Sequence, residues 1–171
     1  MRKYLDNENM NIARGLIPGV SGVHKFGAVP AMSQSQTGSV WDLNDTLYPW
    51  SATGSGIQVN VDAANAADVG KSVVVSGLDA NYNPISETIV LAAQADNLST
   101  NTFIRVNRAY MIDGNGNVGD INIQANTTTI ARITAGLSQT LMAVYTVPAG
   151  YTAYLTKGVM TAQASADGTG N

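Results

Sequence analysis

The sequence predicts an all-β protein: an antiparallel β-sandwich of jelly-roll-like type, preceded by an extended N-terminal arm and followed by the start of a second β unit. Three observations support this fold class. Roughly seven strand-like runs lie between residues 40 and 135, spaced about 8 to 14 residues apart. Gly, Asn, Asp and Pro separate these runs, and no βαβ pattern interrupts them. We therefore expect little helix and three parts, which are an arm (1–45), a sandwich domain (46–136) and a second, incomplete β domain (137–171).

Residues 1–45 contain prolines, glycines and a polar run, but they lack hydrophobic periodicity. Residues 1–25 carry four basic and two acidic groups, a balance of +2, whereas the remainder carries five basic and ten acidic groups, a balance of −5, giving −3 in all. Scattered apolar residues in a chain without periodicity are typical of an arm that becomes ordered on a partner. A mobile tail without a docking role is the alternative. The expected docking residues are Leu16, Ile17, Pro18, Val20, Val23, His24, Lys25 and Phe26.

Two tryptophans, Trp41 and Trp50, mark the entry to the sandwich domain. Aromatic residues in such positions usually close one end of a core or pack beneath a crossing segment. We expect this packing role for both, and stacking on a sugar is the alternative. Residues 57–62 then alternate strictly and predict a half-buried strand, and residues 63–70 predict a short helical turn or a wide loop that ends at Gly70.

The central feature of the chain is a predicted hairpin over residues 73–91. A β-branched run begins it, a turn rich in Gly, Asp, Asn and Pro follows, and residues 85–91 alternate between apolar and polar. Glu87 lies on the apolar face between Ile85 and Ile89, so we expect it to point inward and to pair with Arg105 or Arg108.

A polar loop is expected over residues 94–101, followed by one long strand over 102–112. Arg105 and Arg108 would fall on opposite faces of an ideal strand, which indicates a bulge or bend between them. Residues 120–125 and 127–134 alternate, and Asn126 is expected to turn between them.

Residues 139–147 and 151–156 predict two further strands, joined by the turn sequence Pro148-Ala149-Gly150. Another strand is expected from residue 159 to 164, and the final Asp167-Gly168 turn has no returning strand after it. We interpret this as an unfinished β unit that a longer natural chain or a partner completes.

The composition excludes several classes of function. The chain lacks cysteine, which excludes disulfides, zinc thiolate sites and thiol nucleophiles. A net charge of −3 gives no electrostatic footprint for nucleic acid. No apolar run reaches the roughly 20 residues of a membrane span, and the N-terminus lacks the apolar core of a signal peptide. Charged residues form only 12% of the chain, which suits a protein that meets other proteins over much of its surface.

No residue pattern supports catalysis or metal binding. Residues 113–120 place oxygen side chains at alternate positions, but Val118 and Gln124 stand where a calcium loop needs Gly and Glu. His24, the single histidine, lies in the arm and is a poor member of a catalytic triad. The carboxylates available for glycoside hydrolysis offer no distinguished pair; they include Asp42, Asp62, Asp79 and Asp96. We expect no enzyme activity, no cofactor and no metal site.

Several short motifs resemble a group of tailed-bacteriophage virion proteins. They are Ile17-Pro18-Gly19-Val20, Val23-His24-Lys25-Phe26-Gly27, Val40-Trp41-Asp42, Gly77-Leu78-Asp79, Glu87-Thr88-Ile89-Val90-Leu91 and the run QTLMAVYTVPAG over residues 139–150. The resemblance spans about residues 15–157, and its motifs are structural. It implies a protein of the virion surface, assembled in the host cytoplasm as a homotrimer. Members of the group continue into a further β domain where this sequence stops.

Our first hypothesis from the sequence is a structural protein that decorates the capsid or forms a short head fibre, with the arm docked on another virion protein such as the major capsid protein. The alternative is a tail-associated fibre or adhesin, anchored on tail proteins by the same arm, that contacts host surface glycan. A β-sandwich enzyme acting on carbohydrate is the third hypothesis, and it would need a pair of carboxylates in a cleft.

Overall fold

A computed structural model describes residues 8–33 and 35–163 of the chain. A short helix, α1 (Glu8–Ala13), precedes an extended arm, which leads into the β domain. The 3₁₀ turn η1 (Ala66–Asp68) lies between the first two strands. The strands are β1 (Ile57–Ala63), β2 (Ser72–Leu78), β3 (Pro84–Val90), β4 (Asn97–Phe103), β5 (Arg105–Met111), β6 (Ile121–Ala125) and β7 (Thr128–Ile133).

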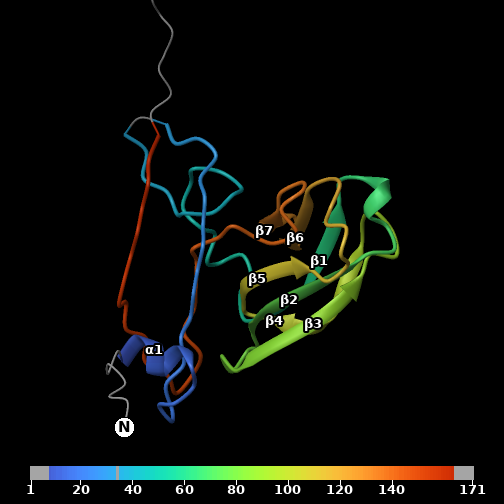
Figure 1. Cartoon of the computed structure of the whole chain (residues 1–171). Helices are drawn as coiled ribbons and strands as arrows, with labels where there is room; N and C mark the ends of the chain where they lie inside the picture. The colour runs from blue at the N-terminus through green and yellow to red at the C-terminus, as the bar shows by residue number, and fades with distance from the viewer. Residues whose placement is uncertain (1–7, 34, 164–171) are drawn as a thin grey trace, which may run out of the picture.

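The strands form two antiparallel sheets that pack against each other, which confirms the predicted β-sandwich (Figure 1). One sheet has the order β4-β1-β6-β7 and the other has the order β3-β2-β5. The core between them is built from alternating β-branched residues, because every second side chain of each strand points inward. Its fully buried members include Val59, Val61, Val73, Val75, Ile121, Ile123, Ile130 and Ile133.

Local signals in the sequence predicted several elements correctly. The β2–β3 hairpin forms, with Ile85 and Ile89 turned to the core. The β6–β7 hairpin has Ala125 opposite Thr128, and Asn126 takes the positive φ of 53° that its tight turn requires. The predicted helical turn is η1, whose first amide groups are capped by the Asn65 side chain.

The predicted polar loop over 94–101 is wrong, because residues 97–103 form strand β4. Two polar residues, Asn97 and Ser99, occupy its inward positions and are buried. Asn97 donates to the Val61 carbonyl at 2.8 Å, and Ser99 accepts from the Val59 amide at 2.9 Å. The predicted single strand over 102–112 is therefore divided at Ile104 between β4 and β5.

The expected strands at 139–147 and 151–156 do not form in the described chain. Residue Gln139 makes one isolated bridge to Tyr110, and beyond it residues 141–147 find no strand partner. The alternation of apolar residues in this stretch still corresponds to burial, because Met142 and Val144 are buried against the sandwich. Residues 151–163 are exposed throughout. Part of the strand expected over 159–164 and the final turn lie outside the described residues, and a second β domain from residue 137 stays a prediction.

Glu87 has a different partner from the expected arginines. Its carboxylate accepts hydrogen bonds from the backbone amides of Thr100 at 2.7 Å and Asn101 at 2.8 Å. Glu87 thus joins β3 of one sheet to β4 of the other at the open side of the sandwich.

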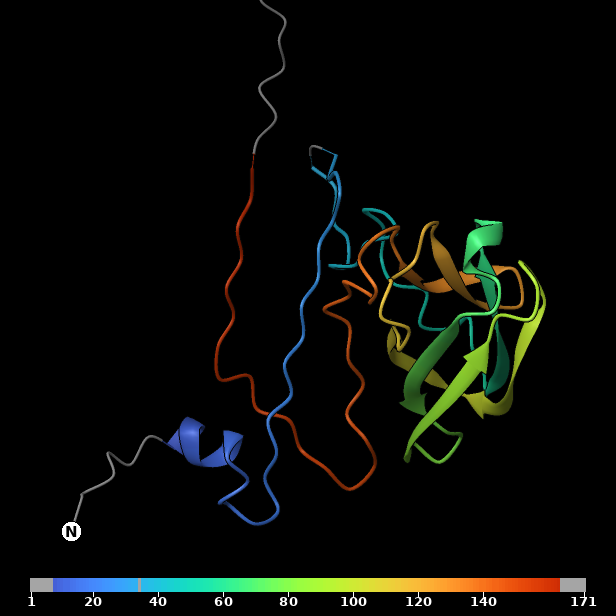
Figure 2. The ribbon, with the colours of Figure 1, turned by 45° about the vertical axis from the view of Figure 1, so that its right-hand side comes forward.

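The arm and the C-terminal segment, which we define as residues 137–163, run beside each other (Figures 1 and 2). The Ala28 amide donates to the Leu141 carbonyl at 3.1 Å, and the Ala143 amide donates to the Val40 carbonyl at 2.8 Å. The arm and the C-terminal segment therefore meet on one side of the sandwich, where they leave a groove against the β3-β2-β5 sheet.

Candidate functional site

The groove lies between the arm, the outer face of the β3-β2-β5 sheet and the C-terminal segment, and its volume is about 520 Å³. Residues from all three walls line it. They are Val23, His24 and Lys25 of the arm; Ser76, Gly77, Leu78, Pro84, Ile85, Ser86, Asn107, Arg108 and Tyr110 of the sheet; and Tyr145 and Pro148 of the C-terminal segment.

The sheet gives the groove a polar floor through its register. Ser86 of β3, Ser76 of β2 and Arg108 of β5 are paired across three neighbouring strands, so they share one row on the outer face. The two serine hydroxyls lie 2.9 Å apart. Arg108 extends over the ring of Tyr110, 4.6 Å from its centroid, and donates to the Gln139 side chain at 2.7 Å.

A β-bulge at Asn107 attaches the arm and the C-terminal segment to the sheet. The register of β2 and β5 shifts between the Ser76–Arg108 and Gly77–Val106 pairs, which leaves Asn107 without a strand partner. The Lys25 ammonium donates to the freed Asn107 carbonyl. The Asn107 side chain accepts from the Thr146 amide at 3.0 Å. The bulge expected between Arg105 and Arg108 is confirmed, and it anchors the arm and the C-terminal segment together.

The groove carries positive charge. Burial, with a further contribution from the nearby Arg108 guanidinium, lowers the pKa of Lys25 from 10.5 to about 8. Among the described residues that line the groove, none carries a carboxylate. An arrangement of cations without a counter-charge is suited to holding an anion.

The predicted docking residues of the arm lie along its extended path. Four apolar members are largely exposed, with Phe26 at 70%; they are Leu16, Val20, Val23 and Phe26. Pro18 and His24 are exposed, and Ile17 and Lys25 are half-buried. The structure brings Val23, His24 and Lys25 to the groove, whereas Leu16, Val20 and Phe26 lie outside its lining.

The two tryptophans have different environments. Trp41 is buried in the core and packs edge-to-face with Tyr48 at 5.1 Å between ring centroids. Trp50 is half exposed, contacts Tyr48 edge-to-face at 4.7 Å and lies beneath the Arg105 guanidinium.

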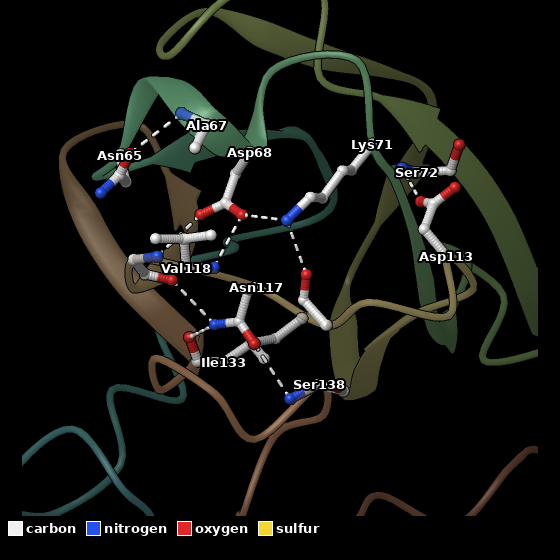
Figure 3. A network of polar contacts seen from close by, with 12 residues as sticks. Asn65, Ala67, Asp68, Lys71, Ser72, Asp113, Asn117, Val118, Ile133 and Ser138 are labelled. Carbon is white, nitrogen blue, oxygen red and sulfur yellow. Dashed lines mark hydrogen bonds and ion pairs between the residues drawn. The ribbon is translucent and has the colours of Figure 1, made fainter.

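The loop over residues 113–119 is organised by the protein's own side chains (Figure 3). The buried Asp68 carboxylate accepts from the Val118 and Gly119 amides at 2.8 Å and from the Lys71 ammonium at 2.7 Å. Lys71 also donates to the Gly116 carbonyl at 2.7 Å. Burial alone would raise the pKa of Asp68, but these hydrogen bonds hold it below its ordinary value. A lysine side chain thus supplies the positive charge inside this loop.

Other carboxylates are held by local contacts. Asp42 is buried, which raises its pKa, and it accepts from the Thr134 hydroxyl at 3.0 Å. Asp79 accepts from the amides of its own turn at Asn81 and Asn83, and Asp62 accepts from the Asp96 amide. Within the described residues, no three His, Asp or Glu side chains gather to hold a metal ion.

Comparisons with family models, curated proteins and solved structures found no match. Over residues 8–33 and 35–163, the structure contains no helix with the length and hydropathy needed to cross a bilayer.

Sequence reasoning did not identify the groove residues Ser76, Ser86, Asn107 and Tyr145. They are distant in sequence, and their grouping depends on strand register. The one local signal was the spacing of Arg105 and Arg108, which predicted the bulge.

Proposed function

We propose that this chain is a non-enzymatic structural protein of a tailed-phage virion, displayed on the particle surface as a capsid decoration protein or a short head fibre and docked through its N-terminal arm. The observation that carries this proposal is the row of exposed apolar side chains along an extended arm. Such side chains are shielded from water only when a partner covers them. The placement in a virion rests on the motif resemblance.

The backbone of the arm supports the same role. Residues 21–29 lie outside any helix, strand or turn, and the Ala28 amide in that stretch is tied to the C-terminal segment. An extended segment with free backbone groups can pair with the edge of a partner's sheet or lie in a partner's groove. We propose that this partner is another virion protein and that the assembled form is a homotrimer.

The alternative, a tail-associated adhesin, would use an exposed aromatic residue to stack on host glycan. The two tryptophans are the stacking candidates that the sequence suggested, but Trp41 is buried and the Trp50 ring already contacts Tyr48 and the Arg105 guanidinium. We therefore favour the decoration or head-fibre role.

The test combines substitution of the arm with particle labelling. A variant with Leu16, Val20, Val23 and Phe26 all changed to Ser removes the proposed contacts without touching the core, and we expect it to be absent from purified particles of the encoding phage. The matched control changes four exposed apolar residues of the C-terminal segment to Ser, and it should be incorporated; they are Tyr151, Tyr154, Leu155 and Val159.

An antibody to residues 46–136 then locates the protein by electron microscopy. Label over the head supports decoration or a head fibre, and label only at the tail supports the adhesin. An antibody that binds the free protein but labels no particle contradicts the virion proposal.

A further inference from the structure

The groove beside the arm contains two cations that lack an acidic partner. Two ion pairs occur within the described parts of the chain, Lys71–Asp68 and Arg132–Asp120, and neither involves Lys25 or Arg108. Lys25 is satisfied by the Asn107 carbonyl, and Arg108 by an amide oxygen of Gln139 and by an aromatic ring. Lys25 and Arg108 thus have hydrogen-bond partners, but a carboxylate balances neither of their positive charges.

Lys25 is half-buried and Arg108 is exposed, and holding the Lys25 ammonium in a partly desolvated position near a second cation is unfavourable. The lowered pKa of Lys25 reports that cost, since burial and the Arg108 charge both oppose the ammonium form. A carboxylate placed between the two cations would remove it and would accept charge-assisted hydrogen bonds from both.

The surroundings indicate what carries the carboxylate. Pro84, Pro148 and the largely exposed side chain of Val23 form apolar parts of the groove wall, and the exposed side chain of Phe26 follows Lys25 along the arm. A polypeptide with apolar residues beside an acidic one would cover these surfaces. A hydroxyl-rich sugar acid would leave them in water.

We propose that the groove binds a carboxylate side chain of a partner protein, with the Lys25 ammonium and the Arg108 guanidinium as its charged donors. This inference rests on the proposed docking function and specifies the partner's chemistry, which is an acidic residue flanked by apolar residues on the segment that meets the arm.

The probe is an end-blocked Leu-Glu-Leu tripeptide, titrated into the full chain and followed by NMR. We expect the amide signals of Asn107, Arg108 and Tyr110 to shift on binding. The Leu-Gln-Leu tripeptide, which has the same shape without the charge, should bind about tenfold more weakly or worse, because it loses the charge-assisted bonds.

Two variants remove one cation each and keep the apolar stem of the side chain, Lys25→Met and Arg108→Met. Each should weaken Leu-Glu-Leu binding about tenfold or more. Lys157→Met is the matched control, because Lys157 is an exposed lysine of the C-terminal segment outside the groove, and it should bind as the unchanged protein does. Thermal unfolding of each variant checks that the fold is retained.

The pH dependence of binding is a second readout. The charged or titratable groups that line the groove with Lys25 are His24 of the arm, Arg108 and Tyr110 of β5, and Tyr145 of the C-terminal segment. Since the Lys25 ammonium loses its proton near pH 8, binding should weaken as the pH rises from 7 to 9. The Lys25→Met variant should lose this dependence.

Three results would overturn the proposal: equal binding of Leu-Glu-Leu and Leu-Gln-Leu, equal loss in Lys157→Met and Lys25→Met, or glucuronate binding more tightly than the acidic tripeptide. The last result would assign the groove to a sugar acid.

Incorporation into particles separates this proposal from the docking function. Exclusion of the arm variant from particles, together with no binding of the tripeptide, would support the docking function and contradict the carboxylate site. Binding of the tripeptide, together with normal incorporation of the arm variant, would contradict the docking function.

Discussion

Single polar side chains hold the irregular parts of this protein in place. Asp68 fixes the loop over 113–119 through two backbone amides and an ammonium group. Asn117, inside that loop, donates to the Ile133 carbonyl at 3.1 Å and accepts from the Ser138 amide at 3.0 Å (Figure 3). Because buried polar groups are costly unless their hydrogen bonds are made, Asp68 and Asn117 are sensitive positions although they add no apolar side chain to the core.

Asp68→Asn should lower the free energy of unfolding at pH 7 by about 2–4 kcal/mol, because its NH2 group would face one of the two backbone N–H donors and the Lys71 charge would be left unpaired. Urea denaturation measures the change. The control is Asp96→Asn, an exposed residue with a positive φ of 64° that asparagine tolerates, and it should change stability by less than about 0.5 kcal/mol.

The ion pair of Asp68 and Lys71 also makes the free energy of unfolding depend on pH. The pKa of Asp68 is lower in the folded chain than in the unfolded chain, so its stabilisation is complete above the unfolded pKa near 4 and is lost as the pH falls through the folded value. The stability difference between the original protein and Asp68→Asn should therefore shrink at acid pH, and a difference that stays constant down to pH 2 would contradict this account.

Among the larger elements, the arm depends on a close approach of two backbones. A Cβ atom on Gly27 would lie 2.6 Å from the Ala143 amide nitrogen and 2.8 Å from the Val40 carbonyl oxygen. No side chain fits there, so the absence of a Cβ lets the arm reach the C-terminal segment.

Gly27→Ala should displace the arm from the C-terminal segment without unfolding the sandwich. Hydrogen exchange of the Ala28 amide, which donates to the Leu141 carbonyl, should speed up about tenfold or more. Gly22→Ala is the matched control, because its nearest contact to an added Cβ is an ordinary 3.8 Å. Unchanged exchange at Ala28 in Gly27→Ala would show that the arm is held elsewhere.

The elements also show which structural features can be predicted from the sequence. The β2–β3 and β6–β7 hairpins were predictable because alternation and turn residues such as Asn126 are local signals. Strand β4 was not, since its inward residues Asn97 and Ser99 are polar and their hydrogen bonds come from β1, about 40 residues away. The groove was hidden for the same reason, because Lys25 and Asn107 are separated by 82 residues and meet only through a bulge.

At the scale of the whole molecule, the C-terminal segment changes from core to surface within a few residues. Met142 is 1% exposed, whereas Met160 is 87% exposed and Leu155 is 92% exposed. The first part of the segment packs against the sandwich, whereas the side chains of the last part lie in solvent.

Two methionines test this boundary. Met142→Ala should lower the free energy of unfolding by about 2–4 kcal/mol, because it opens a cavity in the core. Met160→Ala should change it by less than about 0.5 kcal/mol when the protein is dilute. Urea denaturation at several protein concentrations checks both values. A large effect of Met160→Ala at low concentration would show that this part of the segment packs on its own chain.

The attachment of the arm has a consequence for biosynthesis. The arm is translated before the residues that receive it, Asn107, Leu141 and Ala143, which follow it by about 80 residues or more. Because chains fold progressively as they emerge, the nascent arm lacks these intramolecular contacts until residues 107–143 have been made. During that interval its apolar residues are accessible to chaperones and to neighbouring nascent chains on the same message, so the order of synthesis itself favours contacts between molecules over contacts within one.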